Sequence, residues 1–482
     1  MLQQLKDAGF AHVIDFLETY KDVTLGSVLD EIFATPVPSS ESFKRILLEQ
    51  VDDYALNAQY LKTQIQSYLE NTSTLMCANH AGFENHPMLI ASTLLSSVYF
   101  AKKGIHALPY CSCSALNPSN ATAPTAVFTG QRQKDSLKRR RFRFTPASAD
   151  KKILYSLKGL NASDYEKIMA RIIKSDESCS AALKYICQKC MDLDADANKS
   201  KTKLISTLHK FNTINYAAFA DKAFDINPVF INQERFVISL LINDLDDDSA
   251  FISRLVDNKD YILNIAKNLA NKSNTWSDSL CSLDSDTKKA LENGHGTVFF
   301  YALENDSLKP LKLAANKGQL LLVNETLNLS LDRKSLKQHL QQGSLIPNLY
   351  ICYASLYFTH NVRTAGGIFM TQYLRDMLSI SAKVMHLELK DDYFLGNVIS
   401  ACIMPFVTVQ SDSDCRALLL CDMAGSSCQP DFLHSVLDAR VGDFTDMTLC
   451  EMVYDFTSAQ TALSLKDKLS AIKAGIIQTN RV

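Results

Sequence analysis

The chain has 482 residues, a formal net charge of -2 at pH 7, 46% hydrophobic residues and 21% charged residues. This composition is typical of a globular protein with two or three domains, and the near-neutral charge argues against a general polyanion-binding protein. No apolar run reaches the roughly 20 residues that span a bilayer, and the first residues lack the pattern of a signal peptide. Thirteen scattered cysteines favour reduced thiols, so we expect a cytoplasmic protein. From the charge and the short apolar runs, neither nucleic acid nor a membrane is expected as a partner.

The first part of the chain, residues 1–72, carries apolar residues at three- and four-residue spacing and is predicted to form a helical lead. A short apolar run follows and ends in a polar turn, which is typical of a buried strand that delivers a loop. Pro87 suits the first turn of a helix, and Gly104 suits the position just past its end. A second short apolar run, Ile105–Ser112, completes a right-handed βαβ unit within residues 73–150.

In open parallel sheets, ligands bind outside the carboxyl ends of the strands, so the residues that follow these two strands predict a ligand site. Polar and ionisable side chains are concentrated there, namely Asn79, His80, Glu84, Asn85 and His86 with Gly82 among them, and then Asn117 and Asn120. A histidine that caps the helix and ordinary Asn-Pro turn chemistry explain the same residues without a function. Both explanations stay open on the sequence.

The middle of the chain, residues 151–290, is predicted to be a helical insertion with further α/β elements. It contains a strand at Ile226–Asn232 and helices at Arg235–Leu245 and Phe251–Leu269. Before it, the basic run Lys138–Phe144 is expected to be a solvated surface loop, or a clamp for a phosphate or carboxylate.

Residues 291–395 are predicted to hold a small β meander and then a strand and helix of the core. Short apolar runs separated by turn residues predict antiparallel strands at Thr297–Leu303, Leu311–Leu313 and Gln319–Val323. They are followed by a helix at Ser335–Gln342 and an apolar strand region within Leu345–Thr359. The rest of the sheet is expected to come from strands at Ala382–Leu389, Val398–Val409 and Arg416–Leu420. C-terminal α/β elements are expected over 396–482, with a terminal amphipathic helix at Ser458–Ile477.

The glycine pair Gly366–Gly367 opens a helix that continues through Gln372 and Tyr373. Adjacent glycines allow a ligand close to backbone N–H groups at a helix N-terminus, where the helix dipole favours anions, and Arg363 would strengthen that preference. A tight turn that needs positive φ explains the pair equally well. No metal site is expected, since the one C-x-x-C motif, Cys187–Cys190, has no second pair at zinc-finger distance.

From about residue 45 to 395, the order of these parts resembles the bacillithiol synthase family, the cysteine-adding ligases of thiol biosynthesis. Ile346–Tyr350, leading to the glycine pair and to Gln372–Tyr373, is similar to the family's Ser-Pro-Asn strand, Gly-Gly-Pro-Gly-Glu loop and aromatic position. His80–Phe83 resembles the H-x-G-H signature of the related nucleotidyltransferases, with His86 as a substitute for the second histidine. The chain departs from the family where Asn79–Phe83 replaces a Gly-Gln-Gln loop, where Ile368–Phe369 replaces Pro-Gly-Glu, and in lacking a heptad pattern.

The resemblance implies an α/β fold with a Rossmann-like parallel sheet core, a helical N-terminal lead, a helical insertion and a small antiparallel β meander. It also implies a ligase or transferase that joins an amine or amino acid, cysteine-like in the family, to a small acceptor, with ATP or ADP for activation. His80 and His86 would then act as acid and base, with Glu84 orienting one of them. The substrate would be bound by Asn79, Gly82, Asn85, Asn117, Asn120, Arg363, Gly366, Gly367, Gln372 and Tyr373.

Two further functions remain open. One is a metal-dependent hydrolase or lyase that uses His80, Glu84 and His86 as ligands, and the other is a non-catalytic protein that uses the same groove for binding. The expected partner in every case is a small molecule, and a homodimer is left open.

Overall fold

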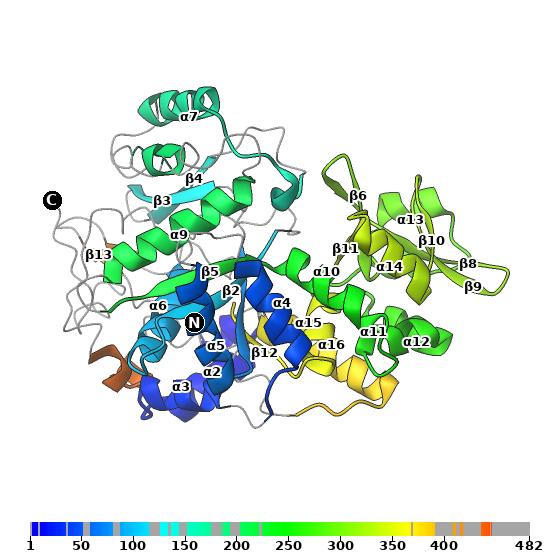
Figure 1. Cartoon of the computed structure of the whole chain (residues 1–482), viewed down its shortest axis with the longest axis horizontal. Helices are drawn as coiled ribbons and strands as arrows, with labels where there is room; N and C mark the ends of the chain where they lie inside the picture. The colour runs from blue at the N-terminus through cyan, green and yellow to red at the C-terminus, as the bar shows by residue number, and fades with distance from the viewer. Residues whose placement is uncertain are drawn as a thin grey trace.

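Figure 1 shows the computed structural model of the chain, in which a parallel sheet lies at the centre and helices pack around it. The structure describes residues 2–7, 10–34, 37–51, 58–80, 87–114, 126–133, 136–143, 152–174, 184, 187–192, 203–220, 224–367, 370–390, 408–410, 415–417, 435–443 and 445. One hydrophobic core connects the helical lead, the parallel sheet and the second half of the chain, since it extends from Leu5 to Val441.

The predicted helical lead is confirmed. Its helices are α1 (Leu2–Asp7), α2 (Ala11–Tyr20), α3 (Leu25–Phe33), α4 (Glu41–Val51) and α5 (Ala58–Asn71). Helix α3 illustrates the local reasons, because the Thr24 hydroxyl accepts the N–H of Ser27 as an N-cap, and apolar residues at helical spacing bury one face. From that face, Phe33 stacks against Tyr99 and meets Phe100 edge to face, and both partners belong to the first helix of the α/β core.

The central sheet confirms the α/β class. It contains β12 (Arg363–Ala365), β1 (Thr74–His80), β2 (Ala107–Cys113) and β5 (Asn227–Asn232), in that spatial order and all parallel. Helix α6 (Pro87–Ala101) connects β1 to β2 as the βαβ prediction requires. Every residue of β2 is buried, which is usual for a parallel strand that is covered on both faces.

The strand order creates a topological switch point beside β1. The chain passes from β1 to β2 and then to β5 in one direction across the sheet, whereas β12 pairs with the opposite side of β1. The helices that follow β1 and β12 are α6 and α16 (Met370–Met385). Their connections therefore leave the sheet at neighbouring carboxyl ends, which is where ligands bind in open α/β sheets.

The insertion contains a hairpin as well as helices. Its elements are β3 (Ala126–Gln133), β4 (Ser136–Arg143), η3 (Leu154–Ser156), α7 (Ala162–Lys174) and α9 (Leu204–Ala220). The basic run expected as a loop lies largely in β4, which pairs with β3 in antiparallel register from Ala126↔Arg143 to Gln133↔Ser136. That prediction was wrong because cationic composition reports solvent exposure and carries no information on backbone pairing. Helix α9 packs along β5 (Figure 1).

Helices and two small sheets make up the second half. They are α10 (Gln233–Asp244), α11 (Phe251–Asp257), α12 (Lys259–Leu269), η4 (Asp278–Leu280), α13 (Thr287–Asn293), β6 (Phe300–Glu304), β7 (Ser307–Lys309), β8 (Lys312–Asn316), β9 (Gln319–Val323), β10 (Asn328–Ser330), α14 (Arg333–Gln341), β11 (Leu345–Pro347) and α15 (Leu349–Phe358). The helix predicted over Phe251–Leu269 is two helices, because Asn258 adopts an extended conformation and caps α12.

The antiparallel prediction is confirmed for part of its range and corrected for the rest. Strands β8, β9 and β10 form one meander, but β6 pairs with β7 and β11 in a separate sheet. In Figure 1, these sheets lie with α13 and α14 to one side of the parallel sheet. Short strands of this kind can pair with several neighbours, so their partners depend on the packing around them.

Two predicted strands are helical. Within Leu345–Thr359 only β11 is extended, and α15 follows it because Asn348 caps its first turn by accepting the N–H of Ile351. Helix α15 is apolar on nearly all sides, so its sequence lacks the period that separates helix from strand. Ala382–Leu389 begins in the last turn of α16, where its apolar spacing belongs to the helix.

The C-terminal region is described in part. Strands β13 (Thr408–Gln410) and β14 (Cys415–Ala417) form an antiparallel pair and do not join the parallel sheet, and the short helix η6 (Val436–Asp438) packs on α3. The terminal helix predicted at Ser458–Ile477 lies outside the described residues. Among the helices that are described, none is long and apolar enough to cross a membrane.

Candidate functional site

The glycine pair lies against β1 at the switch point. Strand β12 ends at Ala365, which is opposite Met76, and a Cβ atom built on Gly366 would overlap the carbonyl oxygen of Cys77. Gly366 does not have positive φ. The tight-turn explanation therefore does not hold for Gly366, which is required because two backbones approach closely.

Strand β1 continues for three residues beyond Cys77, so Asn79 and His80 form its carboxyl end. Between Met76 and Asn79 the pairing with β2 shifts by one residue, which is a β-bulge, and His80 then pairs with Cys113. Bulges are common beside active sites, where they change the direction of a strand end. The structure thus places the end of β1 and the glycine pair on neighbouring strands at one edge of the sheet.

Several predicted site residues cannot be placed further. The side chains of Asn79 and His80 lie outside the described part of the chain, as do Gly82, Glu84, Asn85, His86, Asn117 and Asn120. Their assignments stay predictions, and so does that of Gln372, of which only the helical backbone is described. Tyr373 lies in the first turns of α16, where it is buried and stacks on Tyr353 with ring centroids 6.3 Å apart.

Arg363 lies at the other end of its strand from the glycine pair. It pairs with Thr74 at the amino end of β1, and its guanidinium donates hydrogen bonds to the backbone carbonyls of Ile32, at 3.1 Å, and Ala34. This residue joins the helical lead to the sheet. The structure therefore does not bring it to the edge where Gly366 and His80 lie.

Buried thiols and a tyrosine form the floor below this edge. The thiols come from β1, β2 and α15 and are Cys77, Cys111, Cys113 and Cys352, all buried and outside any disulfide. Burial raises the pKa of Cys77 and of Cys352 well above the usual range, so both are neutral at pH 7 and are poor nucleophiles. The Tyr353 hydroxyl is also buried and has no hydrogen-bond partner among the described residues. Such a group is costly unless a ligand or water satisfies it.

A buried carboxylate that was not predicted from the sequence lies at the same edge. Glu234 is 1% exposed in the first turn of α10, directly after β5. Its oxygens accept the backbone N–H of Ser114 at 2.9 and 3.0 Å, the Ser114 hydroxyl at 2.9 Å, the Cys113 thiol at 2.9 Å and the Asn232 amide at 2.9 Å. The Asn232 oxygen caps α10 by accepting the N–H of Arg235. An asparagine cap and an acidic first turn after a strand were the available signals.

The Glu234 network connects several parts of the fold. Burial raises the pKa of Tyr155, and the nearby charge of Glu234 raises it further. Burial also raises the pKa of Tyr301 to about 12, with a smaller contribution from Cys113. Tyr155 belongs to the insertion and Tyr301 to β6. Because its oxygens are occupied by internal donors, Glu234 holds the segment after β2 in place and gathers hydroxyl and amide groups at the edge.

The edge offers hydrogen-bond donors and helix N-termini more than metal ligands. Among the described residues, no group of three or more His, Cys, Asp or Glu side chains is arranged to hold a metal ion. Glu84 and His86 are not among them. The chemistry that the described residues support is the binding of a polar or anionic small molecule.

Comparison with known proteins adds no family. No protein-family model matches the chain, and no curated protein matches it. What can be stated of its class is an α/β fold built on a four-stranded parallel sheet, with N-terminal helices and small antiparallel sheets.

Proposed function

We propose that the protein is a small-molecule ligase or transferase that joins an amine or amino acid to an acceptor at the carboxyl edge between β1 and β12. The observation that carries this proposal is the switch point itself. Two stretches separated by about 285 positions, the end of β1 and the glycine pair, lie on adjacent parallel strands at the place where open α/β sheets bind ligands.

The two helices that start at this edge favour an anionic substrate. Helix α6 has 15 residues and α16 has 16, and the first N–H groups of any helix lack intrahelical acceptors. These N-termini suit a carboxylate or the phosphates of ATP or ADP, which would supply activation of the acceptor when bound. The close contact at Gly366 fixes where α16 begins relative to β1.

The acid–base groups of the proposal come from the end of β1 and the loop after it. His80 and His86 would move a proton to or from the amine, and Glu84 would orient one of them. The resemblance to bacillithiol synthases suggests a cysteine-like amine. The Tyr353 hydroxyl on the floor would offer a buried donor to the substrate.

The first experiment identifies the substrate by comparing metabolites in cells with and without the gene. His80→Ala and His86→Ala should each lower turnover of that substrate by roughly 10² or more with a nearly unchanged Tm. His106→Ala is the matched control, because His106 lies just before β2 at the amino edge and bonds the carbonyl of Asp225 at 2.8 Å. It should leave turnover unchanged.

Two results separate the proposal from its alternatives. Stoichiometric metal in the purified protein, lost together with activity on chelation, would favour a metal-dependent hydrolase or lyase. Ligand-induced increases in Tm by amino acids or nucleotides without turnover would favour a binding protein. A double variant at His80 and His86 that restores the missing metabolite as well as wild type would remove these residues from the site.

A further inference from the structure

A second constellation of reactive side chains lies away from the carboxyl edge. The Oγ of Ser40 is 2.7 Å from Nδ1 of His360, and Nε2 of His360 is 3.0 Å from Oδ2 of Asp244. His360 precedes the amino end of β12, Asp244 is the last residue of α10, and Ser40 immediately precedes α4. A hydroxyl, an imidazole and a carboxylate are therefore joined in one line from three distant segments.

The contacts determine which nitrogen of His360 carries a proton in the neutral ring. Nε2 faces a carboxylate, which accepts hydrogen bonds and donates none, so Nε2 is the protonated nitrogen. Nδ1 then presents its lone pair to the Ser40 hydroxyl. This is the arrangement in which an imidazole removes a proton from a hydroxyl while a carboxylate stabilises the imidazolium that forms.

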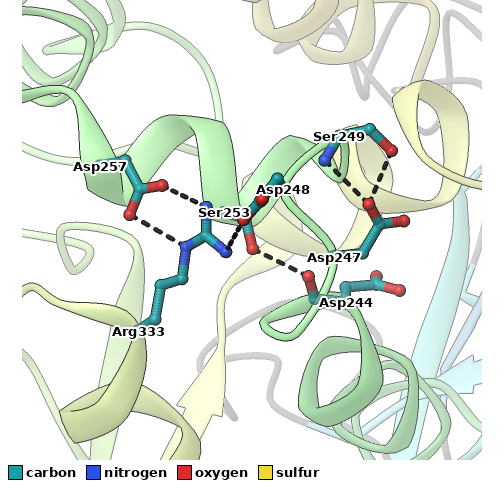
Figure 2. A network of polar contacts seen from close by, with 7 residues as sticks. All are labelled: Asp244, Asp247, Asp248, Ser249, Ser253, Asp257 and Arg333. Carbon is teal, nitrogen blue, oxygen red and sulfur yellow. Dashed lines mark hydrogen bonds and ion pairs between the residues drawn. The ribbon is translucent and has the colours of Figure 1, made fainter.

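The positions of His360 and Asp244 are fixed by their surroundings. His360 is fully buried beside the ring of Phe43, with centroids 6.3 Å apart, and its carbonyl accepts the N–H of Ser40 at 3.1 Å. Figure 2 shows that the Ser253 hydroxyl donates to the backbone carbonyl of Asp244, at 2.8 Å. The base and its carboxylate therefore need little reorganisation before reaction.

The turn after α10 is also held in place. Arg333 forms ion pairs with Asp248 and Asp257, and Asp247 accepts hydrogen bonds from the backbone and the hydroxyl of Ser249 (Figure 2). These contacts clamp the turn between α10 and α11, directly beyond Asp244. They keep the end of α10 from fraying, which would otherwise let the carboxylate move away from the imidazole.

The hydroxyl end of the line is the end that solvent reaches. Ser40 is partly exposed, whereas His360 and Asp244 are buried. Ser40 directly precedes the 11-residue helix α4. The N–H of Phe43 bonds the Ser40 oxygen, and the earlier N–H groups of this helix, which lack intrahelical acceptors, can stabilise a developing oxyanion. Beside it, Ser39 is 4% exposed, and its buried hydroxyl has no hydrogen-bond partner among the described residues, so a further donor is present.

We propose that Ser40 is the nucleophile of a second, esterase-like site that takes small activated acyl compounds. Ser40 Oγ forms a bond to the acyl carbon as its proton passes to Nδ1 of His360. The bond to the leaving alkoxide then breaks, and this group takes the proton from Nδ1. Water attacks the acyl-serine in the same way, which releases the carboxylic acid and restores the Ser40 hydroxyl. Asp244 is a positioning residue that keeps its negative charge throughout.

The competing explanation is structural. The same bonds join the helical lead to α10 and to the start of β12, and the Ser40 oxygen accepts the N–H of Phe43 at 3.2 Å as a helix cap. A purely structural serine would be no more reactive than any other surface hydroxyl. Both explanations predict that substitutions here lower stability, so stability measurements do not separate them. Chemical reactivity at Ser40 does, because only a nucleophilic serine would react.

The test uses the full chain and a fluorophosphonate, whose phosphorus a reactive serine attacks with loss of fluoride. We expect about one adduct per wild-type chain, mapped to Ser40 by peptide mass spectrometry. Ser40→Ala should prevent labelling. Ser42→Ala is the matched control, because its hydroxyl lies 3.1 Å from that of Ser40 while the hydroxyl that bonds Nδ1 of His360 is that of Ser40, so this variant should still be labelled at Ser40.

The roles of His360 and Asp244 are tested by comparing how fast folded variants are labelled at Ser40. His360→Gln and Asp244→Asn should each slow labelling of Ser40 by roughly 10² or more. Circular dichroism and urea unfolding identify any variant that fails to fold, and the wild-type result stands independently of them. An unlabelled wild-type protein, under conditions that label a known serine esterase, would overturn the proposal. So would an adduct on another serine, or equal rates for wild type and folded Asp244→Asn.

Discussion

At position 366, the backbone of β12 passes so close to β1 that there is no room for a side chain. The neighbour is the carbonyl of Cys77, a backbone atom that cannot move without displacing β1. Gly104 is different, because it has φ +78 and nothing lies within 4 Å of a Cβ built on it. The two glycines are therefore needed for separate reasons, one for space and one for backbone conformation.

This difference predicts unequal costs for alanine. Gly104→Ala should lower the free energy of unfolding by about 1–2 kcal/mol, the usual cost of a left-handed conformation. Gly366→Ala should lower it by about 3 kcal/mol or more, since overpacking against backbone adds to the cost. Urea unfolding at one protein concentration measures both. A Gly366→Ala protein as stable as wild type would show that β12 does not pack against β1 in this way.

A buried histidine sets part of the dependence of stability on pH. Nε2 of His209 lies 2.6 Å from the Ser112 hydroxyl, and burial lowers its pKa from 6.5 to about 3. The unfolded chain therefore binds a proton at this residue at a higher pH than the folded chain. Its contribution to stability is complete above the unfolded pKa of about 6.5 and is lost as pH falls toward 3.

We expect His209 to account for about 2–3 kcal/mol of the stability lost between about pH 7.5 and about pH 4.5, at about 1.4 kcal/mol per pKa unit. His209→Gln cannot gain a charge, so its unfolding free energy should fall less over the same interval. Urea unfolding of both proteins at the two pH values gives the difference. Parallel pH profiles for the two proteins would contradict the assignment.

At the scale of elements, α10 links the two proposed sites. Its first turn carries Glu234 at the carboxyl edge of the sheet, and its last residue is Asp244 in the line to Ser40. Each end is fixed by side chains from elsewhere, namely Ser114 and Asn232 at the start and Ser253 at the end. Changes at one end of this rigid helix can be measured without disturbing the other.

Glu234→Gln tests the network at the carboxyl edge. The new amide would direct a donor at groups that already donate to the carboxylate, including the N–H and hydroxyl of Ser114. We expect the free energy of unfolding to fall by about 2–3 kcal/mol, because buried donors lose a charged acceptor. Glu292→Gln on the exposed face of α13 is the control and should change it by less than about 0.5 kcal/mol. Equal effects would mean that the carboxylate contributes no more than a surface glutamate.

At the scale of the whole molecule, one continuous core predicts cooperative unfolding. Trp276, the only tryptophan, is fully buried, and its indole N–H donates to the carbonyl of Ala266 at 2.9 Å. Its ring packs against Phe299 and Tyr350, so its fluorescence reports on the second half of the chain. Far-UV circular dichroism reports on helix content throughout the chain, including the described helices of the lead and the insertion.

We expect the fluorescence and circular dichroism transitions in urea to coincide within error, because the same hydrophobic core includes the helical lead, the sheet and Trp276. The measurement is two titrations of one sample. A tryptophan transition well separated from the loss of helix would show that the second half unfolds as an independent unit.

Local patterns in the sequence determined the class of fold. Pro87 and Gly104 mark the ends of a helix between two apolar runs, and that order is enough to predict a parallel βαβ unit. The same patterns failed at Leu345–Thr359, because a helix that is buried on nearly all sides has no polar face to reveal its period. The order of parts that resembles the bacillithiol synthase family, rather than residue spacing, predicted that His80 and Gly366 lie at one edge of the sheet.

Tertiary structure decided which distant residues meet. Strand β12 has only three residues, and its place beside β1 depends on pairing and packing that no local pattern records. The Glu234 network joins residues about 120 positions apart, and Ser40 meets His360 across 320 positions. Spacing along the chain predicts contacts only within one helix, one strand or one turn, whereas these side chains are brought together by the burial of a common core.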